Sequence, residues 1–370
     1  MAFKTTRLLG GALFLTAFGF TEVGSLEAST PLNFPFVKVR KASESDGKKI
    51  CKKEIPAPVL ELDLLSIYDP EDDSHSKIDP TRKKQYDAAI KSVRSFVNDV
   101  TGFGSNYVQT DGNRLEAAAC VFAYLDAWAK ADAMSVIKTR QSALSSTRIL
   151  AGTALTYMQV RGAASLLGVD TTEIDQWLDR RAAAIIPVYE DSGDRKSNKQ
   201  NHRYWGGLAV AAIGVAIGKK EYLDFGVESY KIGVCQVQAD GSLPLELVRK
   251  ARARDYHLHA TAPLVMIAEL AAANGIDAYA MCDGAIHRLI DFDLRAVNDP
   301  TEIENLTGTK MLALPTNDGF LRGDRFAWVD AYFARFPEFA NKHKLNLNRP
   351  LFSSNIGGRI TVMYDVNYRN

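Results

Sequence analysis

The sequence predicts an all-α protein, an incomplete α/α toroid built from stacked helical hairpins. Apolar residues recur at three- and four-residue spacing through most of the chain, which is the period of an amphipathic helix, and strand-like alternation is scarce. Gly168, Gly218 and Gly275 each stand where one helix should end and another soon begins. Each interval holds two helices and their connections, so the repeating unit is a helical hairpin. The absence of a sharper repeat consensus, together with a single deep site, favours a toroid over an open solenoid.

Eight segments carry the helical period in order along the chain. They are residues 85–100, 115–130, 145–167, 172–186, 204–217, 221–236, 261–273 and 278–292. A further helix is expected at 324–336, and the last apolar run, 359–364, is predicted to be a short strand or an extended tail. No linker interrupts the series, so we expect residues 29–370 to form one domain.

Residues 1–28 are predicted to be a secretory signal peptide. Lys4 and Arg7 precede an apolar run from 8 to 20, and small residues follow at 24, 25 and 28. The run is too short for a comfortable membrane span. We therefore expect a periplasmic protein without stable membrane association; a retained anchor is the alternative.

Four cysteines bear on this expectation, because export permits disulfides. Cys51 follows the leader in an irregular arm and Cys120 lies in a predicted helix, so a bridge between them would attach the arm to the body. Cys235 and Cys282 both fall in helical stretches. Buried free thiols are the simpler interpretation there, and a second bridge stays open.

The charge balance excludes some partners. The formal net charge is +1 over 370 residues, whereas a nucleic-acid binder normally shows a marked basic excess. Attraction for an anionic partner must therefore be local. We expect a monomer that binds an anionic polysaccharide and no nucleic acid.

Residues 66–80 are predicted to form a lid. An acidic, turn-rich stretch from 69 to 76 follows Tyr68, and such a loop can close over a cleft with the tyrosine at its base. A solvated acidic loop is the alternative.

The functional signal lies in two stretches, residues 201–205 and 249–259. On a helix at ~100° per residue, Arg249, Arg252 and Tyr256 would share one side. Arginine is rarely buried without a partner, so this side is suited to an anion, although a solvated face is the alternative. The upstream stretch adds a hydrogen-bonding pair and two aromatic rings of the kind that stack on sugars. Its four residues are Asn201, His202, Tyr204 and Trp205.

These residue types suit β-elimination on a uronate polymer. Asn201, His202 and Arg249 can neutralise the sugar carboxylate, and Tyr256 can take the C5 proton and return one to the leaving oxygen. A free phenol is ionised about one time in a thousand at pH 7, a penalty of ~4 kcal/mol. Arg249 and Arg252 are expected to favour the phenolate. His202 is the rival base.

Three other readings remain open. His257 and His259 face apart on a helix, so a metal pair is disfavoured and no metal or other cofactor is expected. Glycoside hydrolysis needs two carboxylates flanking one bond. The candidates are Asp194, Asp240, Glu246 and Asp255, none of which is paired with another in an aromatic setting. A non-catalytic uronan-binding protein of an export system would use the same arginines and aromatic rings.

The two stretches resemble polysaccharide lyase family 5, the periplasmic alginate lyases. Residues 200–205 read Gln-Asn-His-Arg-Tyr-Trp where the family carries Asn-Asn-His-Ser-Tyr-Trp. Residues 241–259 read Gly-Ser-Leu-Pro-Leu-Glu-Leu-Val-Arg-Lys-Ala-Arg-Ala-Arg-Asp-Tyr-His-Leu-His. The family carries Gly-Phe-Leu-Pro-Asn-Glu-Leu-Lys-Arg-Arg-Gln-Arg-Ala-Leu-Ala-Tyr-His-Asn-Tyr there. Further matches at Cys51, Tyr68, Cys120 and Trp128, and near both 327 and 357, extend the likeness over nearly the whole chain after the leader.

The resemblance implies metal-free eliminative cleavage of polymannuronate in a tunnel-like cleft. It assigns carboxylate neutralisation to Asn201, His202 and Arg249 and acid–base chemistry to Tyr256, and it pairs Cys51 with Cys120. From it we expect substrate contacts from Tyr68, Trp128, Tyr204, Trp205, Arg252, His257 and Arg325. Polymers of glucuronate, such as polyglucuronate and hyaluronan, are the runner-up because C4 and C5 keep the same geometry.

The chain departs from the family at several positions of the site. Ile67 replaces a lid lysine, Arg203 a serine and His259 a tyrosine. Asn355 replaces an arginine, and Arg325 or Arg359 is expected to supply the missing contact.

Overall fold

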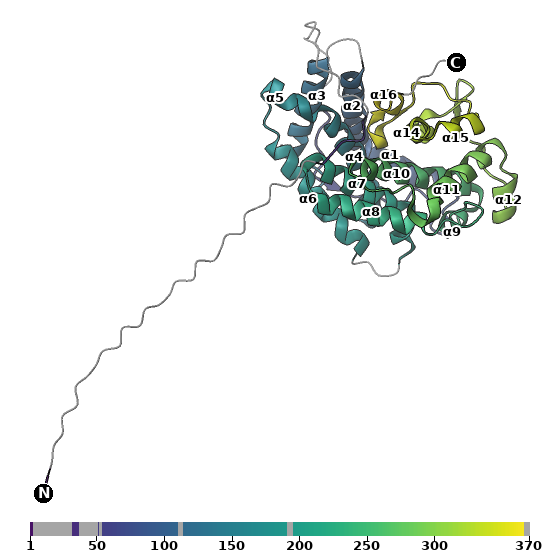
Figure 1. Cartoon of the computed structure of the whole chain (residues 1–370), viewed down its shortest axis with the longest axis horizontal. Helices are drawn as coiled ribbons and strands as arrows, with labels where there is room; N and C mark the ends of the chain where they lie inside the picture. The colour runs from purple at the N-terminus through teal and green to yellow at the C-terminus, as the bar shows by residue number, and fades with distance from the viewer. Residues whose placement is uncertain (3–31, 37–50, 52–53, 110–113, 191–194, 366–370) are drawn as a thin grey trace. The chain divides into compact units, whose positions relative to one another are not determined.

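The computed structural model describes residues 1–2, 32–36, 51, 54–109, 114–190 and 195–365 (Figure 1). Residues 1–30 separate from residues 31–370 as a unit of their own, and every described helix and strand belongs to the second unit. Of the predicted signal peptide, 1–28, only the first two residues are described. Residues 37–50 of the expected arm also lie outside the described part.

Helices dominate the described chain. The α-helices are α1 (Pro80–Ala89), α2 (Lys91–Val108), α3 (Arg114–Lys130), α4 (Arg140–Val160), α5 (Ala164–Leu167), α6 (Thr172–Glu190), α7 (Asn201–Ile217), α8 (Lys220–Val234), α9 (Pro244–Leu247), α10 (Ala253–Ala273), α11 (Met281–Asn298), α12 (Thr301–Thr307), α13 (Gly323–Phe326), α14 (Trp328–Arg335), α15 (Pro337–Lys342) and α16 (Ile360–Met363). Short 3-10 helices are η1 (Arg161–Ala163), η2 (Lys196–Asn198), η3 (Lys250–Arg252) and η4 (Ser354–Ile356).

The strands form only three two-stranded pairs among the described residues. β1 (Glu61–Leu62) pairs in parallel with β2 (Val136–Ile137), and two antiparallel pairs join β3 (Thr316–Asn317) to β4 (Phe320–Leu321) and β5 (Phe352–Ser353) to β6 (Gly358–Arg359). The all-α prediction is confirmed.

Local sequence explains where the principal helices begin and end. Asp79 accepts a hydrogen bond from the Arg82 amide at the start of α1, and Thr139 does the same for the Ser142 amide at the start of α4. Gly168 closes α5 and Gly218 closes α7 with φ of 63° and 81°, a left-handed conformation that glycine adopts without a Cβ penalty. The predicted punctuation by glycine is therefore confirmed.

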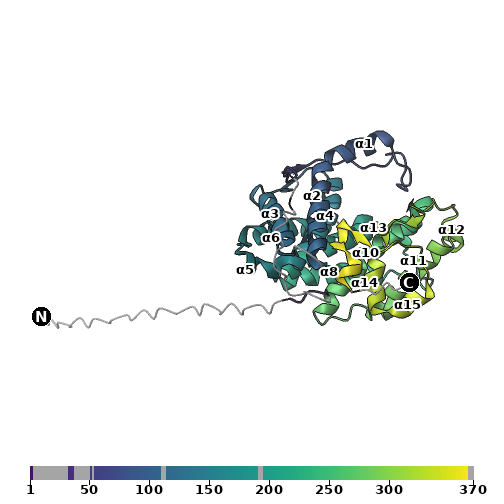
Figure 2. The same ribbon diagram turned by 90° about the horizontal axis from the view of Figure 1, so that it is seen from above.

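The helices pack as pairs arranged around a ring. α2 packs on α3, α4 on α6, α7 on α8 and α10 on α11. Along the inner row α2, α4, α7, α10 and α14 each contact the next, and α16 contacts both α14 and α2 (Figures 1 and 2). The ring thus closes through short C-terminal elements instead of another hairpin, which is the arrangement of an incomplete α/α toroid.

The final run differs from its prediction. Residues 359–364 were expected to be a strand or an extended tail, but only Arg359 is in a strand, and α16 follows at once. Ile360, Thr361 and Met363 are all buried, so burial on several sides hides any period in a run this short.

Two disulfides join distant parts of the chain. Cys51 pairs with Cys120 at a Cα–Cα distance of 5.6 Å, as the resemblance implied. Cys235 pairs with Cys282 at 5.4 Å, so the simpler interpretation of buried free thiols was wrong. Sequence could not decide this second case, because helical periodicity does not reveal which helices adjoin.

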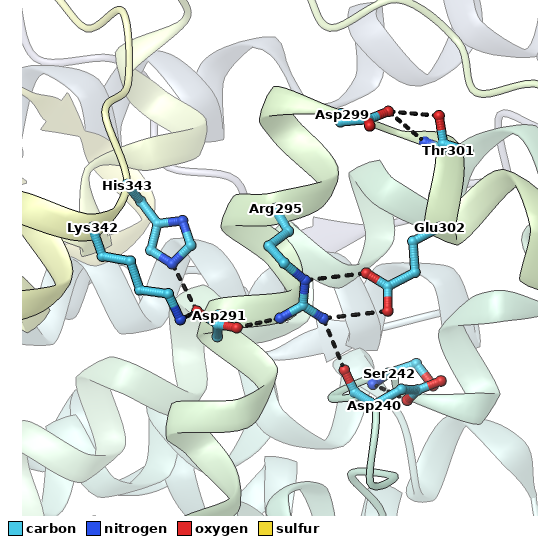
Figure 3. A network of polar contacts seen from close by, with 9 residues as sticks. All are labelled: Asp240, Ser242, Asp291, Arg295, Asp299, Thr301, Glu302, Lys342 and His343. Atoms are coloured by element: carbon cyan, nitrogen blue, oxygen red, sulfur yellow. Dashed lines mark hydrogen bonds and ion pairs between the residues drawn. The ribbon is translucent and has the colours of Figure 1, made fainter.

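A network of polar contacts joins α11 to its neighbours (Figure 3). Asp291 accepts from Arg295, Lys342 and His343, which ties α11 to α15. Arg295 also pairs with Glu302 of α12 and donates to the Asp240 carbonyl at 3.1 Å. These contacts hold α11, the partner of the site-bearing helix α10.

The inner row leaves no room where α4 meets η4. A Cβ built on Gly152 would collide with the carbonyl oxygen of Ser354. Gly152→Ala should therefore lower the free energy of unfolding by about 1–3 kcal/mol through overpacking. Chemical denaturation would measure this loss.

Gly162→Ala is the matched control, because a Cβ there meets nothing within 4 Å. It should change stability by no more than ~0.5 kcal/mol. Equal stability of the two variants would contradict the tight approach.

Candidate active site

A cavity of about 1090 Å³ opens between the inner helices and the segment before α1. Its cationic lining residues are Lys83, Arg94, Arg140, Arg148, Lys196, Arg249, Lys250, Arg252 and Arg325. Its acidic ones are only Asp73, Asp87, Asp255 and Asp324. The cavity is therefore strongly positive although the whole chain is nearly neutral, which suits an anionic ligand.

The first residues of α7 form one wall. Asn201 is fully buried, and its backbone N–H donates to Glu246 Oε1 at 2.8 Å. Its side-chain amide donates to both Glu246 carboxylate oxygens at 3.0 Å. Burial raises the pKa of Glu246, and these hydrogen bonds from Asn201 oppose the rise. The pairing joins the two stretches that the sequence singled out.

The predicted helical face required residues 249–259 to form one continuous helix. The structure does not have such a helix. Arg249 precedes η3, Lys250 has φ of 50°, and α10 begins only at Ala253. Arg249 and Tyr256 nevertheless meet, since the guanidinium carbon lies 4.4 Å from the centre of the phenol ring. Arg249 is 6% exposed, and its Nε has no hydrogen-bond partner among the described residues.

Trp205 ties α7 to α10 beside the reaction centre. Pro263 lacks the N–H that would bond the His259 carbonyl one turn earlier in α10. The Trp205 indole N–H donates to that carbonyl at 3.1 Å instead. The predicted sugar-stacking residue thus lines the cavity and also positions His259, whose ring lies 5.2 Å from the indole.

The segment predicted to form a lid, residues 66–80, contributes to the lining of the cavity. The Tyr68 and Tyr256 hydroxyls are 2.5 Å apart, and Arg252 Nε donates to the Ser76 carbonyl at 2.8 Å. Inside the loop, Asp72 accepts from the Ser74 and Ser76 hydroxyls and from nearby backbone amides. The acidic stretch is therefore an ordered turn, and Tyr68 at its base lines the cavity.

Burial dominates the electrostatics of Tyr256. Removal from water raises the pKa of its hydroxyl well above 10, and Tyr68 adds to the rise while Arg249 opposes it. The expectation that Arg249 favours the phenolate is confirmed in direction, although burial has the larger effect on the pKa of Tyr256. The cation over the ring is outweighed by desolvation.

The histidines of the cavity are neutral at physiological pH. Burial lowers the pKa of His202 to about 3, and Arg249, Arg148 and Arg140 reinforce the shift. Burial also lowers the pKa of His259, with Arg148 as the next cause. Each imidazole can therefore accept one hydrogen bond and donate another without carrying charge.

Three predicted substrate contacts need correction, because the structure places them outside the cavity lining. Trp128 stacks on Phe96 at 3.8 Å, and its indole N–H donates to Pro56 at 2.9 Å. The hydroxyl of Tyr204 donates to the Lys199 carbonyl. His257 points to the opposite side of α10 from Tyr256, where it accepts from the Leu243 amide at 2.9 Å.

The other predicted contacts do line the cavity, namely Tyr68, Trp205, Arg252 and Arg325. The sequence missed Arg140 and Arg148 on α4 and His75 in the lid. Helical periodicity offered no signal for Arg140 and Arg148, because α4 is buried on most of its surface and the side that faces the cavity is evident only in the fold.

The family departures fall into two groups. Ile67, His259 and Asn355 line the cavity, so the substitutions there change its surface. Arg203 turns away and donates to Ser229 at 2.8 Å. Arg359 is absent from the lining and Arg325 is present, which favours Arg325 as the compensating cation.

The carboxylates considered for hydrolysis do not form a catalytic pair. Glu246 is occupied by Asn201, Asp240 lies in the network of Figure 3, and Asp255 is bound between arginines. Asp194 lies outside the described residues. Within the described ranges there is also no group of three or more metal-ligating side chains.

An all-α ring around a cationic, aromatic-edged cavity defines a protein that acts on an acidic carbohydrate. The sequence model of the alginate lyase family matches residues 63–303. The chain belongs to that family, polysaccharide lyase family 5, and is a polysaccharide lyase.

Individual relatives agree. The chain is 30% identical over 354 residues to an alginate lyase of Cobetia marina, covering 92% of each protein. It is 33% identical over 313 residues to a polysaccharide lyase of Stenotrophomonas maltophilia, covering 83% of this chain and 90% of the relative.

Solved structures agree as well. Alginate lyase A1-III from Sphingomonas species A1 superposes with a TM-score of 0.70 at 26% identity, covering 86% of this chain and 88% of the other. A variant of alginate lyase A1-III complexed with tetrasaccharide gives a TM-score of 0.73 at 26% identity, with coverage of 87% and 88%.

No helix within the described residues combines the length and apolarity needed to cross a membrane.

Glu246 offers a test of how the site is held together. Glu246→Gln replaces one carboxylate oxygen by a donor that faces the donors of Asn201. The mismatch should lower the free energy of unfolding by about 1–3 kcal/mol and reduce kcat/KM about tenfold or more. Steady-state kinetics and thermal unfolding would measure both effects.

Asp240→Asn serves as the control, because Asp240 is exposed and lies outside the cavity lining. If Glu246→Gln behaved like this control, the positioning role of Glu246 would be rejected.

Proposed function

We propose that this protein depolymerises the poly(β-D-mannuronate) of alginate by β-elimination and leaves 4,5-unsaturated uronate ends. The observation that carries the proposal is the convergence of Arg249, His202 and Tyr256 in one cation-lined cavity. The relatives, most of which are named alginate lyases, support the substrate class.

The first step is neutralisation of the substrate carboxylate. Arg249 has an unpartnered Nε and lies directly beside Tyr256, so a uronate carboxylate bound to it presents C5 to the phenol. The neutral imidazole of His202 adds a hydrogen-bond donor without repelling the arginines. Asn201 acts mainly by fixing this end of α7, because both hydrogens of its amide face Glu246.

Proton transfer and bond cleavage follow. Tyr256 as phenolate takes the C5 proton, the C–H electron pair forms the C4–C5 double bond, and the C4–O glycosidic bond breaks. The leaving oxygen receives a proton from the same hydroxyl, so the residue ends as it began. Tyr68, 2.5 Å from Tyr256, can accept or donate the proton that the phenol exchanges before each cycle.

Location and organisation form part of the proposal. We propose residues 1–28 as a signal peptide, residues 29–370 as a single monomeric lyase domain, and the periplasm as the site of action. The two disulfides support an oxidising compartment, where such bonds persist.

Substitution of Tyr256 tests the chemistry. Tyr256→Phe should lower kcat by about 10³-fold or more while binding is nearly retained, because only the hydroxyl is lost. Ultraviolet absorbance of the unsaturated ends reports turnover, and calorimetry reports binding.

Tyr222→Phe is the control, since this hydroxyl bonds Asp179 outside the cavity. Substantial turnover by Tyr256→Phe would reject the tyrosine mechanism. Parallel assays on polymannuronate, polyglucuronate and hyaluronan distinguish alginate specificity from the runner-up substrates.

The pH profile separates the two candidate bases. The pKa of Tyr256 is raised above 10, so its phenolate fraction grows about tenfold per pH unit throughout the range from 6 to 9. If the phenolate is the base, log(kcat/KM) should rise with a slope of about one over that range. A flat profile would instead indicate His202, which is fully neutral there because its pKa is about 3.

A further inference from the structure

One carboxylate stands among the cations next to the reaction centre. Asp255 immediately precedes Tyr256 on α10, lines the cavity and is 13% exposed. Its Oδ1 lies 3.0 Å from Arg325 Nη1 and its Oδ2 lies 3.7 Å from Arg252 Nη1. Oδ1 has no aligned hydrogen bond, so these contacts are chiefly electrostatic. A single negative charge therefore compensates two of the arginines of the cavity.

The cluster of Asp255, Arg252 and Arg325 makes further contacts with the rest of the structure. Arg252 also donates to the Ser76 carbonyl of the lid at 2.8 Å. Arg325 comes from α13, and its backbone carbonyl accepts from the Trp328 indole at 3.1 Å. Arg325 also contributes to the lowered pKa of His259, one turn beyond Asp255 on α10, and all three residues line the same cavity as Tyr256.

Two other arginines of the cavity, Arg249 and Arg148, have no such carboxylate beside them in the described part of the chain. Arg249 and Arg148 line the cavity, and neither forms an ion pair with a described residue. A substrate carboxylate gains a full charge-assisted contact there. At Asp255 the same carboxylate would have to compete with an existing negative charge for its two arginines.

Resting on the proposed function, we propose that Asp255 is a specificity-determining residue. It makes the subsite beside Tyr256 one that recognises the hydroxyl groups of a sugar and disfavours a carboxylate. A carboxylate accepts hydrogen bonds from hydroxyls and a guanidinium donates to them. The Asp255–Arg325 pair can therefore bind two neighbouring hydroxyl groups of a sugar, one as acceptor and one as donor. This subsite binds the sugar next to the reacting uronate through its hydroxyl groups and not through its carboxylate.

The test compares two forms of one polymer. Polymannuronate and the same polymer with part of its carboxylates reduced to alcohols differ only in charge. Asp255→Asn should lower KM for polymannuronate about tenfold, because it releases two guanidinium groups, and should change KM for the reduced polymer less than about twofold. Dissociation constants from calorimetry on both polymers provide the same ratio without turnover.

Asp324→Asn is the matched control. Asp324 adjoins Arg325 in sequence, is 46% exposed and pairs with Arg322 at 2.8 Å. This variant should leave the ratio of the two KM values within about twofold. An equal gain for Asp324→Asn and Asp255→Asn, or an equal gain on both polymers, would overturn the proposal in favour of a general charge effect.

Arg325→Ala gives a second test with the opposite sign. Its side chain is 33% exposed, so folding does not depend on it. With one arginine removed, Asp255 is less compensated, and KM for polymannuronate should rise more than KM for the reduced polymer. An unchanged ratio in this variant, or an unchanged or higher KM of Asp255→Asn for polymannuronate, would overturn the role of Asp255. Absence of unsaturated ends with the wild-type protein on both polymers would instead reject the proposed function, and the binding ratio would still decide the specificity.

Discussion

The buried contact between Glu246 and Asn201 is the interaction on which the site depends. It satisfies a backbone N–H at the start of α7 and both hydrogens of the Asn201 amide with one carboxylate. The same carboxylate lies three residues before Arg249, in the segment that leads into α10. A single residue therefore sets the distance between the wall that carries His202 and the wall that carries Arg249 and Tyr256. A buried carboxylate is costly unless every oxygen is occupied, which makes the arrangement specific.

The surplus of positive charge in the cavity has a consequence for its histidines. Arg249, Arg148 and Arg140 together with burial keep His202 unprotonated, as the pKa of about 3 reflects. A site that attracts polyanions would otherwise contain charged imidazoles, which bind product as well as substrate. With neutral histidines, charge compensation falls to the arginines, and the imidazoles keep directional hydrogen bonding. Binding and chemistry are thereby assigned to different residues.

Much of this could be predicted from the sequence, for identifiable reasons. Helical periodicity and terminal glycines such as Gly168 and Gly218 are local signals, and they predicted the helices and the points where several of them end. Arg249 and Tyr256 were recognised together because the motif is contiguous, although Lys250 breaks the helix between them. Trp128 and His257 were misassigned, because a match in type does not tell which side of a helix a ring faces. Arg148 was missed because its neighbours in the site come from other helices.

The state of Tyr256 explains why the substrate has to complete the site. The hydroxyl of Tyr256 lies 2.5 Å from that of Tyr68 and is buried away from water, so the neutral form of the phenol is favoured. Arg249 lies over the ring face with an Nε that has no partner among the described residues, and its charge opposes the rise in the pKa of Tyr256. In the mechanism we propose, the uronate carboxylate binds the Arg249 guanidinium and the sugar separates the hydroxyls of Tyr68 and Tyr256. Separation of the hydroxyls removes one cause of the raised pKa of Tyr256, the contact with Tyr68, while the charge of Arg249 continues to favour the phenolate.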